Sequence, residues 1–313
     1  MEIALILTRE VFVLFLLVAL GIVCRKTGIL DDNSAKKICN FLLMAVIPVL
    51  IIRSFQQDKR PELMLGFWIT FAAAIIMHIV YIFVATFVLK PNGKDDNFRV
   101  QRLAAIYSNS GFMGIPLLMA TIGEEALLYA AVFISVQSLV NWTWGARNMS
   151  GDKRLSLLAL CKNPNIIAFA VGLILFLLEV RLPYILYSFC NFLYGVNTPV
   201  SAVGIGVFLA AIQLKRTLRD ISVYKVTLLR NIILPLITLF IFKAINLSEW
   251  FPNARTVAIC IMIMSSSACA MTAILMTAKY GKNSHYGAEL VAVSTLFSII
   301  TLPFMIYLTQ ILL

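Results

Sequence analysis

The sequence predicts an all-helical membrane protein that crosses the bilayer many times. Of its 313 residues, 61% are hydrophobic and only 13% are charged, and the mean hydropathy is +0.92. Soluble domains carry about 45–50% apolar and about 25% charged residues, so this chain cannot cover itself with a polar surface. Apolar stretches of about 20 residues, the length that crosses a hydrocarbon core, recur from end to end. The composition excludes a soluble enzyme, a secreted disulfide scaffold and a nucleic-acid-binding protein.

Ten membrane spans are predicted, joined by short loops that carry turn-forming residues. No loop is long enough to hold a separate soluble domain, so the chain is not expected to be an enzyme. The first apolar run lacks a basic segment and a cleavage site, and is expected to be a retained span. The predicted spans are 4–24, 36–56, 64–89, 102–122, 124–146, 163–180, 184–213, 224–246, 255–278 and 286–312.

The basic residues predict the orientation. The net charge is +11, from 26 Lys and Arg residues against 15 Asp and Glu residues. Most of the basic residues fall in the loops that follow the odd-numbered spans, and cytoplasmic loops collect Lys and Arg. Both termini are therefore expected outside the cytoplasm of a multi-pass cell-membrane protein. The six cysteines form no CxxC pair or Cys/His cluster, so no metal or other cofactor is expected.

An internal repeat divides the chain into two halves. Cys39-Asn40-Phe41-Leu42, followed by Pro48-Val49, recurs at one offset as Cys190-Asn191-Phe192-Leu193, followed by Pro199-Val200. Each half contains five spans, an odd number, so the halves enter the membrane in opposite orientations. Inverted repeats are typical of secondary transporters, whose substrate sites lie near the midplane at discontinuous helices. The predicted division is 1–148, a cytoplasmic linker over 149–162, and 163–313.

Span four carries the clearest polar interruption. Residues 107–116 read Tyr-Ser-Asn-Ser-Gly-Phe-Met-Gly-Ile-Pro, and Gly114 and Pro116 are predicted to break the helix. The half-helix ends would then present amide groups and a positive dipole to an anion. A kinked but continuous helix with small packing residues is the alternative. In span nine, Ser265–Thr272 is also polar but has no Pro or Gly, so a break and a continuous helix with self-bonded hydroxyl groups remain equal alternatives.

These motifs resemble the auxin efflux carrier family. The similarity lies in residues 108–117, in Asn163-Pro164-Asn165, in Asn197-Thr198-Pro199 and in the stretch from 278 to 303, and it covers essentially the whole chain. Bacterial members include malate and malonate permeases, which suggests a bacterial inner membrane. The resemblance implies ten helices in a five-plus-five inverted repeat. Spans one, two, six and seven would form a scaffold, spans three to five and eight to ten a moving transport domain.

The resemblance also implies a substrate site where broken helices four and nine cross. Asn109 would bind a substrate carboxylate, and Asn197 would contact the site from the scaffold or merely accompany a kink. The family often has a proline in the span-nine crossover, and this chain has none. The implied substrate-binding residues are Ser108, Asn109, Ser110, Gly111, Ser266, Ser267 and Asn197.

Ionisable residues inside membrane spans are rare, and His78 and Arg230 are two of those that the predicted spans contain. His78 lies in the middle of span three and, with Gln137 as a partner, could couple transport to protons. A neutral packing histidine is the alternative. Arg230 lies near the cytoplasmic end of span eight and is expected to extend its charge to the membrane surface.

The sequence therefore predicts a secondary transporter of small organic anions, meaning mono- or dicarboxylates such as malate, malonate or auxin-like acids. Alternating access by an elevator-type movement is expected, driven by protons or by the anion gradient alone. The alternative is a channel-like or signalling protein that retains the fold. The expected partners are the substrate and the lipid bilayer, with no nucleic acid, and a homodimer through the scaffold is a further expectation.

Overall fold

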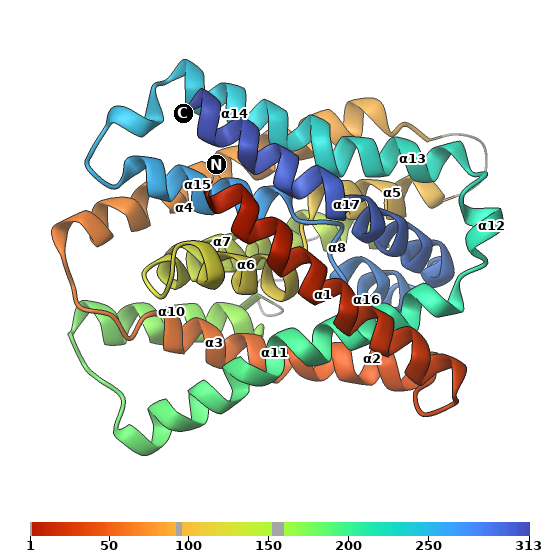
Figure 1. Ribbon diagram of the computed structural model, residues 1–313, viewed down its shortest axis with the longest axis horizontal. Coiled ribbons are helices and arrows are strands. Elements are labelled where there is room, and N and C mark those ends of the chain that lie inside the picture. Colours follow the sequence, from red (N-terminus) through yellow and green to blue (C-terminus); the bar gives the residue numbers. More distant parts are fainter. Residues whose placement is uncertain (1, 92–95, 152–159) are drawn as a thin grey trace.

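The computed structural model describes residues 2–91, 96–151 and 160–313, and every regular element among them is a helix. This confirms the all-helical class (Figure 1). Most of the predicted linker 149–162 lies outside the described residues. In the described part of the chain, seven helices are long and apolar enough to cross a membrane. They are α1 (Glu2–Lys26), α2–η1–α3 (Asp32–Phe41, Leu42–Val46 and Ile47–Ser54), α4 (Pro61–Val88), α7–η3–α8 (Ala126–Val140, Asn141–Gly145 and Ala146–Ser150), α11 (Tyr184–Ala211), α13–η4–α14 (Ile221–Leu228, Leu229–Ile233 and Leu234–Ala244) and α17 (Ser284–Leu312).

Three shorter apolar helices occupy the places of predicted spans four, six and nine. The helix of span four is preceded by the short helix α5, and the helix of span nine is followed by the short helix α16, so spans four and nine each consist of two pieces. The remaining short helices among the described residues are a four-residue α12 and a 3-10 turn. The bounds are α5 (Asn97–Ile106), η2 (Ser110–Gly114), α6 (Ile115–Thr121), α10 (Pro164–Leu177), α12 (Leu214–Thr217), η5 (Leu247–Glu249), α15 (Ala254–Ser266) and α16 (Thr272–Lys279).

Local sequence signals set several helix ends. Asp31 caps α2 by accepting a hydrogen bond from the Ser34 amide at 2.7 Å, and hydrogen bonds from Ser34 lower the pKa of Asp31 below its usual range. Asn163 caps α10, because its side-chain oxygen accepts hydrogen bonds from the amides of Asn165 and Ile166. Pro164 occupies the first helical position, where its missing N–H costs nothing. Gly151 follows α8 with a φ of 75°, a left-handed conformation that favours glycine.

Close packing of α1 against α11 depends on two glycines. A Cβ atom on Gly21 would lie 2.2 Å from the Val203 carbonyl oxygen, and one on Gly206 would lie 2.0 Å from that of Val18. Only glycine allows the two backbones to approach so closely. α11 also packs against α2 and α3, and α3 packs against α10. These five helices form one group, which we call the α1/α11 group.

The other long helices form a second group around the two interrupted spans. α4 and α15 pack against α7, and α13 and α15 pack against α17. We call this set the α7/α17 group. α1 meets α17 across the boundary between the groups, and the two chain ends lie close together in Figure 1.

Candidate substrate-binding site

Both interrupted spans are broken at the point where they cross. α5 ends at Ile106 and α15 ends at Ser266, and each is followed by extended or irregular residues. The two breaks pair in antiparallel fashion, because the Asn109 amide donates to the Ala268 carbonyl at 2.8 Å and the Ala270 amide donates to the Tyr107 carbonyl at 2.9 Å. Span nine is therefore broken without a proline. Pairing with span four satisfies the backbone groups that the break frees.

The break in span four precedes the residues that were predicted to cause it. The non-helical residues are Tyr107–Asn109, whereas Gly114 ends η2 and Pro116 is the second residue of α6. Because η2 runs directly into α6, Pro116 lies inside the continuous helix Ser110–Thr121, and the π-helical turn before it accommodates the missing N–H. Gly114 instead permits close packing, because a Cβ atom on it would lie 2.7 Å from the Met264 sulfur.

Gln137 holds the span-four break in place. Its side-chain oxygen accepts from the Ser108 amide at 3.1 Å and from the Ser108 hydroxyl at 2.9 Å. Its side-chain nitrogen donates to the Ser108 carbonyl at 2.9 Å and to the Ser110 hydroxyl at 3.3 Å. One amide side chain on α7 thus binds the polar groups that an unbroken helix would have used internally.

His78, predicted as a proton-coupling residue with Gln137, lies beside this break, because its ring centre is 6.4 Å from that of Tyr107, the first residue of the break. Its Nδ1 atom is 2.7 Å from the Ala74 carbonyl oxygen, one turn earlier in α4. The ring is buried near the aromatic rings of Tyr81, Tyr107 and Phe133.

Arg230 joins the C-terminal ends of the two first half-helices. It is 0% exposed, and its guanidinium donates to the carbonyls of Ala105 and Ile106, at 3.1 and 2.9 Å, and to that of Ser265. These are terminal carbonyls of α5 and α15, which carry the negative ends of the helix dipoles. The prediction that Arg230 extends to the membrane surface is wrong, because three buried carbonyls offer its charge a nearer partner.

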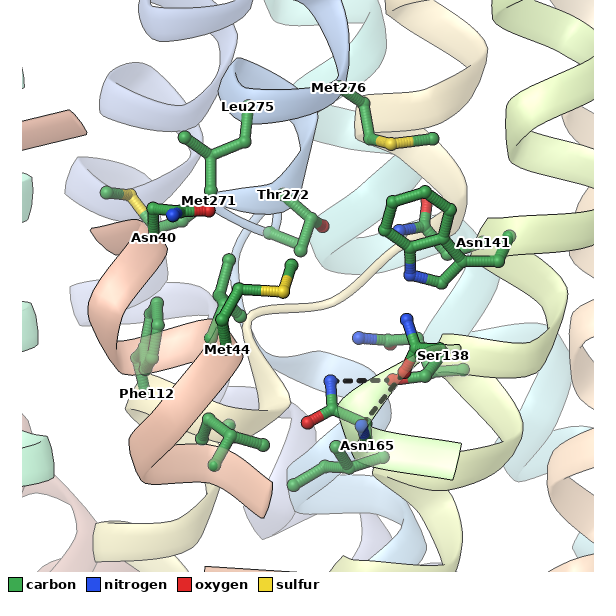
Figure 2. Close-up of a pocket in the computed structure, with 18 of the residues that line it drawn as sticks. Asn40, Met44, Phe112, Ser138, Asn141, Asn165, Met271, Thr272, Leu275 and Met276 are labelled. Carbon is green, nitrogen blue, oxygen red and sulfur yellow. Dashed lines mark hydrogen bonds between the residues drawn. The ribbon is translucent and has the colours of Figure 1, made fainter. Parts of the chain in front are cut away.

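A cavity of about 670 Å³ lies beside the crossing, between the α1/α11 group and the α7/α17 group. Asn40 and Met44 reach it from α2 and η1, and Asn165 reaches it from α10. Ser138 and Thr272 face the same space from α7 and α16 (Figure 2). The breaks therefore form one wall of a cavity whose opposite wall belongs to a separate helix group.

The cavity has the electrostatics of an anion site. Lys36, Lys37, Lys162 and Lys279 line it, and none of the described lining residues is acidic. The N-terminal residues of η2 and of α16 also line it, so two helix ends with free amides and positive dipoles face the cavity.

Asn109 provides an unused donor in this wall. Its side chain is buried, and its Nδ2 atom has no hydrogen-bond partner among the described residues. The Thr272 hydroxyl, also on the cavity, is likewise unpartnered. Unpaired buried polar groups cost free energy, so these atoms are suited to a ligand that enters the cavity.

Some of the predicted site residues line the cavity, and the others are buried behind it or contact its wall. Ser108, Asn109, Ser110 and Gly111 line the cavity. Ser266 and Ser267 are fully buried and do not line it. Asn197 does not line it either, but its Nδ2 atom donates to the Gly111 carbonyl at 2.9 Å and so contacts η2, just after the break, from α11.

Several lining residues are not predicted as site residues by the sequence. Asn40 belongs to the repeated motif and Asn165 to the Asn-Pro-Asn motif. These motifs indicate the repeat and the family, but they do not assign the two asparagines to the site. Met44, Met271 and Met276 also line the cavity, although methionines scattered through apolar spans indicate nothing by themselves. Methionine side chains adapt to ligands of different shapes.

Comparison with known proteins identifies the family. The family described as "Membrane transport protein" matches residues 6–157 and 153–306. The chain belongs to the auxin efflux carrier family. It is 22% identical over 308 residues to an uncharacterized transporter of Methanocaldococcus jannaschii, an alignment that covers 93% of this chain and 95% of that protein. This auxin efflux carrier family member is therefore a multi-pass membrane transport protein, and the family resemblance predicted from residues 108–117 is confirmed.

Proposed function

We propose that this carrier is a secondary transporter of small organic anions and that it binds them in the cavity beside the two breaks. The observation that carries the proposal is Asn109, whose buried side-chain amide has an unused donor on the cavity wall. A carboxylate placed there would accept from Asn109 and from the free amides at the start of η2. Donors to a charged group form the stronger class of hydrogen bond.

The other polar lining atoms favour an anion that also carries a hydroxyl or N–H group. The side-chain oxygens of Asn141 and Asn165 lack hydrogen-bond partners among the described residues, and both residues line the cavity. A hydroxy acid or an indole acid would supply the missing donor. Lys279 lies 4.1 Å from the centre of the Trp142 ring, which places charge and aromatic surface together at the cavity.

The proposed architecture has ten membrane helices in a five-plus-five inverted repeat. Two asparagines at equivalent positions of the repeat support this arrangement, because their surroundings lie on opposite predicted faces of the membrane. Asn40 lines the lysine-containing cavity, whereas Asn191 accepts a hydrogen bond from Arg53, which is predicted on the opposite membrane face. In this proposal the α1/α11 group is the scaffold and the α7/α17 group is the transport domain.

An elevator movement requires the contacts between the two groups to break on the closed side. Arg53 of α3 is buried and pairs with Glu124 at 3.0 Å, in the loop between α6 and α7. The side-chain nitrogen of Gln57 donates to the Glu124 carbonyl at 2.8 Å. We take these contacts as the outer closure of a state whose cavity faces the cytoplasm. Moving the transport domain would carry Glu124 away from Arg53.

Transport is tested with the purified carrier in proteoliposomes. Uptake and counterflow of radiolabelled malate, malonate and indole-3-acetate are measured with and without a pH gradient, which also shows whether protons drive uptake. Saturable counterflow of any of these acids supports a carrier. A continuous conductance without counterflow would instead indicate the channel-like alternative.

Asn109→Ala is the site-directed test of the same proposal. Loss of a donor to a charged group is worth about 1.5–3 kcal/mol, so substrate affinity should fall by about 10- to 150-fold. Asn109→Asp should bind still more weakly, since its charge repels the anion. Asn33→Ala is the matched control, because Asn33 is exposed on α2 and does not line the cavity. Wild-type affinity in both Asn109 variants would place the site elsewhere.

A further inference from the structure

A second cavity, separate from the substrate site, lies where α4, α5 and α8 meet. It measures about 630 Å³. Arg99, Arg102 and Arg147 line it together with Phe98 and Trp144, and none of its described lining residues is acidic. Three guanidinium groups around one cavity repel one another unless an anion occupies it. Nothing in the proposed transport cycle uses this cavity.

The two inner guanidinium groups are held in place by neutral partners. Arg99 donates to the Asn148 carbonyl at 2.7 Å, and Arg102 donates to the Leu89 carbonyl at 2.8 Å. Both guanidinium groups lie over the Phe98 ring, at 5.2 and 4.9 Å from its centre. Carbonyls and an aromatic face orient the two charges without neutralising them.

The nearest carboxylate neutralises this cluster only in part. Asp96 pairs with Arg99 at 3.1 Å and also with Lys282. Lys282 and Arg99 together hold the pKa of Asp96 below its ordinary value, so it carries one negative charge that two cations share. Arg147 is exposed, and no ion pair joins it to another described residue. The described lining residues and Asp96 together leave the cavity with a net positive charge.

The cavity opens onto a surface that faces lipid. Thr86 lines it, and on the same helix Phe83 and Phe87 are 72% and 67% exposed. Ile79, one turn before Phe83, is also exposed, so an apolar stripe runs along α4 to the mouth of the cavity. Trp144, which also lines the cavity, is of a residue type that is enriched at the lipid headgroup level.

We propose that this cavity binds the headgroup of an anionic phospholipid of the cytoplasmic leaflet. The phosphodiester would lie among the three guanidinium groups, which match phosphate oxygens with paired donors. The acyl chains would lie along the exposed stripe of α4. Basic pockets between membrane helices on the cytoplasmic side recognise anionic headgroups in this way. The stripe favours a lipid over a free phosphate ion, since a free ion has no apolar chain that could contact it.

Lipid binding is measured on the full-length carrier in detergent by native mass spectrometry, titrated with dioleoylphosphatidylglycerol, dioleoylphosphatidylcholine or inorganic phosphate. We expect one phosphatidylglycerol to bind more tightly than phosphatidylcholine. Arg147→Gln should lower the affinity for phosphatidylglycerol about fivefold, since one basic residue near an anionic surface contributes about 1 kcal/mol. The double variant Arg102→Gln/Arg147→Gln should lower this affinity further.

Arg216→Gln is the matched control, because it removes an exposed charge from α12 outside the cavity. Its affinity should stay within twofold of the wild type, and melting curves without lipid show that each variant is folded. Three outcomes would overturn the proposal: equal weakening by Arg216→Gln, unchanged binding in both cavity variants, or displacement of the lipid by an equal concentration of inorganic phosphate. The last outcome would assign the cavity to a free phosphate.

Discussion

At the scale of single residues, one arginine and one asparagine have complementary roles at the crossing. Arg230 binds the carbonyl ends of α5 and α15, whereas Asn109 sits where the next half-helix begins and keeps an unused donor. The negative helix ends are thus neutralised by a protein cation. The positive ends remain available to a ligand, so the crossing as a whole favours an anion.

Replacing Arg230 should destabilise the protein more than it alters substrate recognition. Arg230→Met leaves three buried carbonyls without a charged donor, and each unsatisfied group costs about 1–3 kcal/mol. Arg230→Lys should restore only part of the loss, because an ammonium group lacks the planar fork that spans both helix ends. The midpoint of thermal unfolding in detergent measures the effect. An unchanged midpoint in Arg230→Met would show that other groups or water satisfy these carbonyls.

At the scale of elements, helix contacts depend on where small residues allow close approach. Gly206 lies in α11, where a Cβ atom would be 2.0 Å from the Val18 carbonyl oxygen, whereas a Cβ atom on Gly195 of the same helix would meet nothing within 4 Å. The two glycines share a helix and differ only in what faces them. They therefore separate the effect of packing from the effect of helix propensity.

Gly206→Ala and Gly195→Ala should change stability in opposite directions. Gly206→Ala forces α1 and α11 apart, and overpacking of this kind costs about 1–3 kcal/mol. Gly195→Ala gains up to about 1 kcal/mol, because alanine is the better helix former. Thermal unfolding of the two variants, measured side by side, gives the comparison. Equal melting temperatures would mean that the α1–α11 contact is looser than its geometry indicates.

At the scale of the whole molecule, the two proposed halves should face opposite sides of the membrane. The lysines that line the cavity lie in segments that the charge distribution assigns to one face of the membrane, and the cluster around Arg53 and Glu124 lies in segments assigned to the other. The cavity mouth and the outer closure would then lie on opposite sides of one crossing. This topology is a requirement of alternating access.

Single-cysteine labelling tests the topology directly. Asp58→Cys and Ser150→Cys are each introduced into a background without native cysteines, and a membrane-impermeant maleimide is added to intact cells. Asp58→Cys should react from outside and Ser150→Cys only after lysis. Asp58 is suitable because it is well exposed and its ion pair with Arg181 is at the surface, where such pairs contribute little to stability. Labelling of both from outside would contradict the ten-span arrangement.

Much of this protein can be predicted from its sequence, because the relevant signals are local. Apolar length predicts membrane helices, and Asn163-Pro164 marks the start of α10 through its own caps. The polar run at 107–116, with its glycines and proline, predicts that span four is interrupted, although the break lies at 107–109 and not at Gly114 and Pro116. Residues 108–117 carry the family resemblance. The family resemblance implies Ser108–Gly111 as site residues, and they line the cavity.

The tertiary structure alone decided which polar residues serve the cavity and which support it. Arg230 lies in an apolar stretch near a predicted membrane surface, and nothing local shows that the carbonyl ends of α5 and α15 converge on it. Ser266 and Ser267 resemble Ser108 and Ser110 in sequence, yet they are buried behind the cavity. The physical reason is that helix breaks are satisfied by distant partners, so the roles of their polar groups depend on packing between segments far apart in the chain.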